Sequence, residues 1–279
     1  MNPEPTQTAA AQAALAARYG ADAPQIGAVW NDTLEGLLAH RSVRAYLDRP
    51  LAPGTLEAII AAAQSASSSS NQQFWSVVAV EDPDRKARLA ELAGGQAHIR
   101  QAPLFLVWLA DLARSEAVAH RAGVGGEALD YMESLVVALV DVALAAQNAV
   151  AALESLGLGA VYIGALRNQP EAVAELLGLS PLVAPVFGLC IGHPDPDRPA
   201  QVKPRLPQTA VLFHETYDLQ AQPGPIAAYD ATLRGFQRDQ AMGEIGWVRS
   251  VVRRVSQMKA LDGREHLRSA LLGFGFKMK

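Results

Sequence analysis

One apolar segment, from Leu135 to Leu156, constrains the fold of this chain more than any other. It reads LVVALVDVALAAQNAVAALESL, which is long enough for a helix that crosses a bilayer. Polar or charged side chains interrupt it at Asp141, Gln147, Asn148 and Glu154. Such groups are costly in hydrocarbon, so the sequence favours a long helix buried in protein over a membrane span.

The composition is that of a globular protein with a substantial core. The 279 residues are 50% hydrophobic, and 24 basic against 28 acidic side chains give a net charge of −4. This balance gives no general attraction to nucleic acid or an anionic membrane, so neither is expected as a partner. Cys190 is the only cysteine, and no secretory signal is recognisable at the start of the sequence. We therefore expect a cytoplasmic protein without disulfides.

Short β-branched segments alternate with longer helical segments along the chain. Strands are expected at 75–80, 104–110, 161–163 and 186–191, and helices from residue 55 to about 66, at 84–92 and at 129–156. This alternation favours an α/β or α+β sandwich.

Helices are also expected towards both ends of the chain. An alanine-rich helix stops at Gly20, and the next helix begins with Asp32 or Thr33 as its N-cap. Further helices are expected at about 227–241, 245–259 and 267–276.

A proline-rich stretch at 195–207 cannot be regular helix or central strand, so we expect an extended arm there. No repeat and no clear linker is visible. We therefore expect one domain, with an N-terminal helical extension over 1–30, a core over 31–220 and a C-terminal helical extension over 221–279.

Cations gather in two short segments. His40-Arg41-Ser42-Val43-Arg44 combines two guanidinium groups, a hydroxyl and an imidazole, which can hold a phosphate through charge-assisted hydrogen bonds. Lys203-Pro204-Arg205 adds two cations on either side of a stiff proline. Taken alone, each segment is better explained as a solvated basic turn or linker.

Three polar or glycine-rich segments lie between apolar elements. The run SSSSNQQ at 67–73 offers hydroxyls and amides, and Gly94-Gly95-Gln96 places an amide that could match a pyrimidine-like ring. Glycines in GLGAVYIGALR at 157–167 permit close backbone approach to a flat ligand. A plain loop and a flexible turn are the simpler explanations of the first two segments.

Several other chemistries lack their sequence signals. The chain has no HExxH, no P-loop, no GxSxG and no GxGxxG after a strand, and its histidines are scattered without metal-ligand spacing. Cys190 lies in FGLCIG, the pattern of a buried strand, where a thiol is inert. We expect neither a metal site nor covalent catalysis.

In combination and in this order, these segments resemble the nitroreductase superfamily of flavoproteins, in particular the NfsA/FRP group of oxygen-insensitive NAD(P)H nitroreductases and flavin reductases. The resemblance covers roughly residues 33–218. It is carried by HRSVR at 40–44, SSSS at 67–70, AGGQAHI at 93–99, AQNAVAALESLGLGAVYIGALRN at 146–168, FGLCIG at 187–192 and KPRLP at 203–207.

The resemblance implies an α+β fold with a central, mostly antiparallel sheet flanked by helices. It also implies an intertwined homodimer with two FMN molecules at its interface. The long helix around 141–156 would then form the dimer core, which accounts for so apolar a helix in a soluble chain.

The resemblance further implies which residues bind FMN. The phosphate and ribityl chain would be held by His40, Arg41, Ser42, Arg44, Lys203 and Arg205. The serines Ser68, Ser69 and Ser70 would approach the same flavin from the other subunit. Asn71 is a further candidate, because NQQFW at 71–75 resembles the NxQPW loop of the wider superfamily.

The flavin ring has its own implied contacts. Gln96 would bond its pyrimidine edge, and Tyr162, Ile163, Gly164 and Ala165 would lie near the ring. The backbone of Gly164 or Ala165 would lie close to the hydride-accepting nitrogen. No side chain is expected to act as a catalytic acid or base, because the cofactor carries the hydride chemistry.

The activity that the resemblance implies is a ping-pong, two-electron reaction. NADPH or NADH reduces FMN and leaves, and the electrons then pass to a nitroaromatic compound, a quinone or a free flavin. Arg234 and Arg238, after AYD at 228–230, are candidates to bind the 2′-phosphate of NADPH. The alternatives are another flavoenzyme of this fold, such as a dehydrogenase or dehalogenase, and a non-catalytic FMN-binding regulatory dimer.

Overall fold

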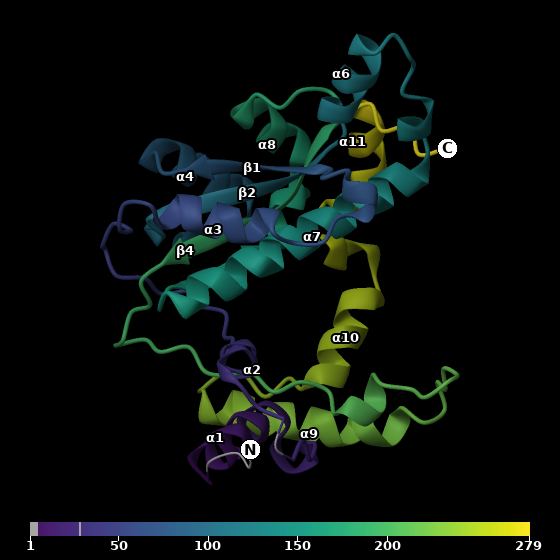
Figure 1. Ribbon diagram of the computed structural model, residues 1–279. Helices are drawn as coiled ribbons and strands as arrows, with labels where there is room; N and C mark the ends of the chain where they lie inside the picture. Colours follow the sequence, from purple (N-terminus) through teal and green to yellow (C-terminus); the bar gives the residue numbers. More distant parts are fainter. Residues whose placement is uncertain (1–4, 28) are drawn as a thin grey trace. The chain divides into compact units, whose positions relative to one another are not determined.

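The computed structural model describes residues 5–27 and 29–279 of the chain (Figure 1). The described residues form two compact units, each built from two stretches of the chain. The helical unit holds the residues up to Arg41 together with Gln201–Leu261, and the sheet unit holds Ser42–Ala200 together with Asp262–Lys279. These units cut across the segments 1–30, 31–220 and 221–279 expected from the sequence, and that division stays a prediction.

The sheet unit is built on four antiparallel strands in the order β1-β2-β4-β3. The strands are β1 (Trp75–Val80), β2 (Leu104–Asp111), β3 (Gly159–Ile163) and β4 (Val183–Gly192). All four strands lie where the β-branched and apolar runs predicted them, and the predicted α+β class is confirmed.

Helices cover both faces of this sheet (Figure 1). The α-helices of the sheet unit are α3 (Thr55–Gln64), α4 (Pro83–Leu92), α5 (Ala97–Gln101), α6 (Ala113–Arg121), α7 (Met132–Ser155), α8 (Pro170–Leu177) and α11 (Leu267–Gly273), of which α3 and α7 cover one face and α4, α5 and α8 the other. Successive side chains of a strand point to opposite faces, so β2 supplies both cores. Leu104, Leu106 and Trp108 pack towards α3 and α7. The intervening residues, Phe105, Val107 and Leu109, pack in the core that includes residues of α4, α5 and α8.

The long apolar segment forms α7, as predicted. Among residues 5–27 and 29–279 it is the one helix that is long and apolar enough to cross a membrane by length and composition. One side of it packs on α3 and the sheet, where Val142, Ala145, Ala149 and Leu153 are buried. This packing confirms that α7 is a core helix on that side.

The helical unit contains α1 (Pro5–Tyr19), α2 (Asp32–Leu38), α9 (Pro223–Asp239) and α10 (Trp247–Val255). The predicted N-cap of α2 at Asp32 or Thr33 is wrong by one or two residues. The Oδ1 atom of Asn31 accepts a hydrogen bond from the Leu34 amide at 2.9 Å, which makes Asn31 the cap. Asparagine caps a helix as well as aspartate does, so the side-chain type alone could not select between neighbouring positions.

Candidate functional site

The second half of the HRSVR segment joins the edge of the sheet beside β3. Ser42 pairs with Ala160, and the Val43 amide donates to the Ala160 carbonyl at 2.8 Å. The Tyr46 hydroxyl then donates to the Val43 carbonyl at 2.7 Å. Ser42 and Arg44 are exposed while Val43 is buried, so this backbone presents its polar side chains to solvent.

A glycine in β3 makes that close approach possible. A Cβ atom added to Gly159 would lie 2.5 Å from the Cγ2 atom of Val43 and 3.0 Å from the ring of Pro194. The first distance is shorter than a Cβ atom tolerates and the second is unusually tight, so a side chain here would displace Val43, and glycine avoids that clash. Gly159 therefore allows the segment around Val43 to lie close against β3.

Arg44 acts electrostatically on α5, the helix that begins directly after Gln96. Burial lowers the pKa of His98 in α5, and the positive charge of Arg44 lowers it further. The Nε2 atom of Gln96 donates to the Ala93 carbonyl at 3.0 Å, which fixes the orientation of its amide. The sheet unit thus brings the predicted phosphate ligand Arg44 and the short α5 helix, which follows the predicted pyrimidine ligand Gln96, into one neighbourhood.

The end of β3 presents backbone and one aromatic ring. Tyr162 is 37% exposed, and its ring packs edge-on against Phe187 with centroids 5.1 Å apart. Burial, followed by the charge of Glu154, raises the pKa of the Tyr162 hydroxyl. Ile163 is buried in the core, so its side chain is directed away from any ligand at the surface. Gly164 and Ala165 follow in a 3-10 turn (Gly164–Asn168).

An arginine in this turn ties it to an irregularity in the sheet. The pairing of β2 with β4 shifts register between Trp108 and Leu109, whose partners are Phe187 and Pro185. Val186 is the extra residue of this bulge, and Arg167 donates to its carbonyl oxygen. A bulge leaves a backbone group unpaired, so Arg167 satisfies it and at the same time anchors the turn that holds Gly164 and Ala165.

The serine-rich loop is organised by Asp141, the carboxylate that interrupts the apolar segment. Asp141 is 2% exposed, and its Oδ2 atom accepts hydrogen bonds from the Ser68 hydroxyl at 2.8 Å and the Phe74 amide at 3.0 Å. The Ser69 amide contacts its Oδ1 atom at 3.4 Å. The Ser68 hydroxyl also accepts from the Gln73 amide at 2.8 Å. The Ser68 side chain is therefore engaged inside the loop.

The remaining predicted ligands of this loop are exposed and lie on a strained backbone. Ser69, Ser70 and Asn71 are exposed in a 3-10 turn (Ser69–Asn71). Ser70, Asn71 and Gln73 have φ values of 47°, 55° and 52°. Left-handed conformations are uncommon for residues other than glycine and cluster at functional sites. The loop is held in this form by Asp141.

The other predicted phosphate ligands belong to the helical unit. His40 is half-buried, and Arg41, Lys203 and Arg205 are exposed. The Arg205 guanidinium folds back to donate to the carbonyls of Lys203 and Pro204 at 3.2 and 3.3 Å. The backbone of both segments is contacted by a residue that the sequence did not single out, Arg18 in α1.

The two predicted 2′-phosphate ligands are paired with acidic groups. The Nε atom of Arg234 donates to Asp230 at 2.8 Å. Arg238 binds both carboxylate oxygens of Glu244, each at 2.9 Å. A phosphate would have to share or displace these partners, so their role in nucleotide binding stays a prediction.

Two further predictions concern metal and thiol chemistry. No group of three or more His, Cys, Asp or Glu side chains suited to a metal ion lies in the part of the chain that the structure describes. Cys190 is fully buried in β4, and this burial raises the pKa of its thiol. A raised pKa disfavours the thiolate, so Cys190 is a buried core residue, and the absence of covalent catalysis stays a prediction.

Three residues that hold the candidate site segments in place were not predicted from the sequence, namely Arg18, Asp141 as a loop anchor, and Arg167. An unexpected carboxylate in an apolar helix was a usable signal for Asp141. The arginines gave no such signal, because their partners are backbone carbonyls, which are present at every residue.

An antiparallel sheet with helices on both faces defines an α+β protein, and its edge beside β3 presents the exposed side chains of Ser42 and Arg44. The profile of the Nitroreductase family matches residues 37–193, and that of the Nitroreductase family, C-terminal domain, matches residues 203–279. This chain therefore belongs to the nitroreductase family, as the resemblance of its motifs predicted.

Curated relatives and solved structures agree with this assignment. The chain is 41% identical over 253 residues to FMN reductase [NAD(P)H] of Bacillus subtilis, covering 89% of this chain and 99% of that one. It is 44% identical over 201 residues to oxygen-insensitive NADPH nitroreductase of Salmonella typhimurium, covering 72% and 80%. NADPH:FMN oxidoreductase of Vibrio harveyi, solved in complex with NAD+, superposes with a TM-score of 0.79 at 35% identity, covering 89% of this chain and all of that one.

Proposed function

We propose that this protein is an FMN-dependent NAD(P)H oxidoreductase that reduces nitroaromatic compounds, quinones or free flavin. The observation that carries the proposal is the cationic segment at 42–44, held on the sheet edge next to β3 and near α5. Relatives named as FMN reductase and NADPH nitroreductase support this chemistry.

The chemistry of the donors fits FMN. Arg44 and the Ser42 hydroxyl are exposed groups suited to a phosphate dianion, and we propose that His40, Arg41, Lys203 and Arg205 join them. The anchored amide of Gln96 suits the pyrimidine edge of the flavin, which has both donors and acceptors. FMN, when bound, supplies the hydride chemistry.

The protein itself would bind and orient. The turn that Arg167 anchors would keep the Gly164 and Ala165 backbone close to the flavin ring, and Tyr162 would line the same side. With a pKa above its ordinary value, the Tyr162 hydroxyl stays protonated and neutral at physiological pH. None of these roles requires a catalytic acid or base.

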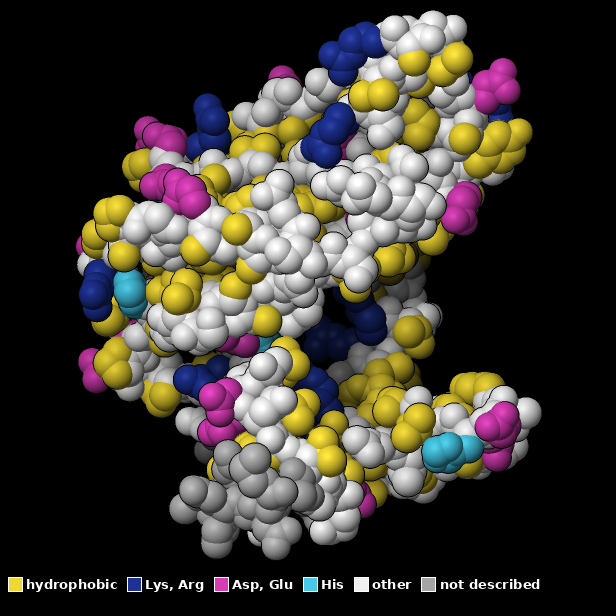
Figure 2. All heavy atoms as spheres, in the orientation of Figure 1, with side chains coloured by type: hydrophobic (Ala, Val, Ile, Leu, Met, Phe, Trp, Pro, Cys, Tyr) yellow, Lys and Arg dark blue, Asp and Glu magenta, His cyan; other side chains and the backbone are white. Residues whose placement is uncertain are grey.

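We propose that the functional unit is a homodimer built on α7. Hydrophobic side chains lie at the surface of the molecule along α7 and α3 (Figure 2). On α7, Val136, Leu139, Val140 and Leu144 are 46%, 40%, 51% and 42% exposed. Exposed apolar residues repeated along one helix are typical of a protein interface. A second copy covering them would bring its loop at 68–71 towards the flavin, as the motif resemblance implies.

Two further assignments complete the proposal. The electron donor is NADPH or NADH, with Arg234 and Arg238 as candidates to distinguish them. The location is the cytoplasm, which suits a chain whose lone cysteine is buried and which uses a nicotinamide donor.

A stopped-flow experiment tests this function. The FMN-loaded protein is mixed with NADH or NADPH, and bleaching of the flavin is followed, then reoxidation by a nitrofuran, a quinone and free FMN. We expect one or both nucleotides to bleach the flavin at least as fast as the enzyme turns over in the steady state. We also expect at least one acceptor to reoxidise it. Bound FMN that neither nucleotide reduces would identify a non-catalytic flavin-binding protein, and equal rates with both nucleotides would argue against a 2′-phosphate site.

A further inference from the structure

Helix α1 lies before residue 37, where the match to the Nitroreductase family begins. It buries one side, formed by Ala11, Leu15 and Arg18, which are 2%, 6% and 5% exposed. The spacing of four and three residues places all of them on one face of the helix. Two of these residues are apolar, so the burial of an arginine at the third position requires an explanation.

The Arg18 guanidinium links two segments that are far apart in the sequence. Its Nη2 atom donates to the carbonyls of Leu38 and His40 at 2.5 and 2.8 Å. Its Nη1 atom donates to the carbonyl of Lys203 at 2.8 Å. One side chain thus joins the backbone that enters the HRSVR segment at 40–44 to the backbone of the Lys203-Pro204-Arg205 segment.

The main chain of the same residue completes the link. The Arg205 amide donates to the Arg18 carbonyl at 2.9 Å, and the Tyr229 hydroxyl donates to the Pro204 carbonyl at 3.1 Å. Lys203 and Arg205 are therefore held through backbone bonds on both sides of the proline. Their side chains remain exposed.

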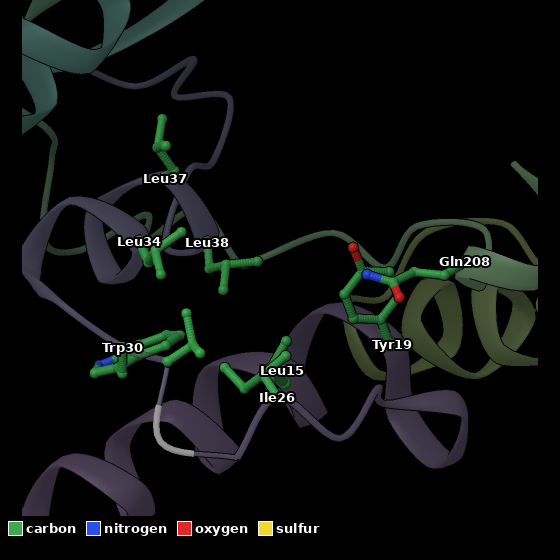
Figure 3. A pocket seen from close by; sticks show the side chains of 9 residues that line it. Leu15, Tyr19, Ile26, Trp30, Leu34, Leu37, Leu38 and Gln208 are labelled. Atoms are coloured by element: carbon green, nitrogen blue, oxygen red, sulfur yellow. The ribbon is translucent and has the colours of Figure 1, made fainter. Parts of the chain in front are cut away.

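Apolar packing between α1 and α2 is incomplete. A pocket of about 560 Å³ lies between them, and its lining includes Leu15 and Tyr19 of α1 and Leu34 and Leu38 of α2. Figure 3 shows side chains of both helices facing this space. The hydrogen bonds from Arg18 to the Leu38 and His40 carbonyls add a polar connection between α1 and the end of α2.

These contacts affect the direction of donor groups. In a trans peptide the carbonyl and the following amide point in opposite directions, so holding the His40 carbonyl towards Arg18 aims the Arg41 amide away from it. The arm around Pro204 has no sheet or helix of its own to order it. Ordering it before the ligand arrives removes an entropic cost from binding.

We propose that Arg18 is a positioning residue for the phosphate end of FMN: it pre-orders His40, Arg41, Lys203 and Arg205 without contacting the ligand. This inference rests on the proposed FMN-binding function. It predicts that the N-terminal helix, outside the family match, contributes to cofactor affinity.

The test compares FMN with riboflavin, which lacks the phosphate. Apoprotein is titrated with each flavin, and Kd is measured by flavin fluorescence for wild type, Arg18→Ala and Arg18→Lys. We expect Arg18→Ala to raise the Kd for FMN about tenfold or more. This is the effect of losing roughly one charge-assisted hydrogen bond at the ligand. Riboflavin affinity should change less than about twofold, and Arg18→Lys should recover part of the loss because it keeps a cationic donor.

Leu15→Ala is the matched control, because it removes buried apolar contact from the same face of α1 and leaves the guanidinium in place. It should preserve the ratio of the FMN and riboflavin affinities. The proposal is overturned if Arg18→Ala keeps the wild-type ratio, or if Leu15→Ala lowers it equally. Should Arg18→Ala not fold, an unchanged ratio in Arg18→Lys overturns it. If wild type itself shows no preference for FMN over riboflavin, the proposed phosphate site fails as well.

Discussion

Replacing Asp141 by alanine removes the anchor of the serine-rich loop. The carboxylate is 2% exposed and accepts bonds from the Ser68 hydroxyl and the Phe74 amide at 2.8 and 3.0 Å, with the Ser69 amide at 3.4 Å. Hydrogen bonds to a charged group contribute about 1.5–3 kcal/mol each, and donors left unpaired after burial cost about 1–3 kcal/mol each. Two well-formed bonds therefore predict a loss of about 3–6 kcal/mol in the free energy of unfolding.

The measurement is urea unfolding at one fixed protein concentration, since the stability of the proposed dimer would depend on concentration. Asp141→Asn keeps the shape and one acceptor oxygen, so we expect it to lose about 1–3 kcal/mol. Asp82→Ala is the matched control. The side chain of Asp82 accepts a hydrogen bond from the Arg85 amide at 2.7 Å and is exposed at the start of α4. Losing this cap should cost only about 1 kcal/mol.

Two outcomes would refute the reasoning about Asp141. If Asp141→Ala were no less stable than Asp82→Ala, the buried carboxylate would not be an anchor. If Asp141→Asn lost as much as Asp141→Ala, the loss would come from the side chain's charge alone and not from the bonds it accepts.

Three further predictions concern the sheet edge, its electrostatics and the dimer. Gly159→Val should detach the segment around Val43, lower stability and abolish FMN retention after gel filtration, because its Cβ would lie 2.5 Å from Val43. His98 has a pKa lowered by burial and Arg44, so its neutral form favours folding. Stability should therefore fall as pH drops below about 6.5 and through the lowered value, and NMR titration of Arg44→Ala should show a higher His98 pKa. Val140→Arg should convert the proposed dimer to a monomer, as measured by light scattering. An unchanged mass would exclude this face of α7 as the dimer interface.

Local pattern determined the elements of this protein and the identity of its site motifs. Strand β1 spans Trp75–Val80 as its β-branched run predicts, and α7 follows the long apolar segment within a few residues. Hydrophobic periodicity is a property of neighbouring residues, so it is readable without knowing the fold. The order of weak motifs identified the family, which the comparisons confirmed.

Only the tertiary structure decided how those elements hold the candidate site. Arg18 contacts a carbonyl 185 residues away, and Asp141 contacts the Ser68 hydroxyl 73 residues away. The sequence marked Asp141 as an anomaly and marked Arg18 not at all. Such contacts depend on which surfaces come together when distant segments pack, and backbone carbonyls, being present at every residue, leave no trace of their partners in the sequence.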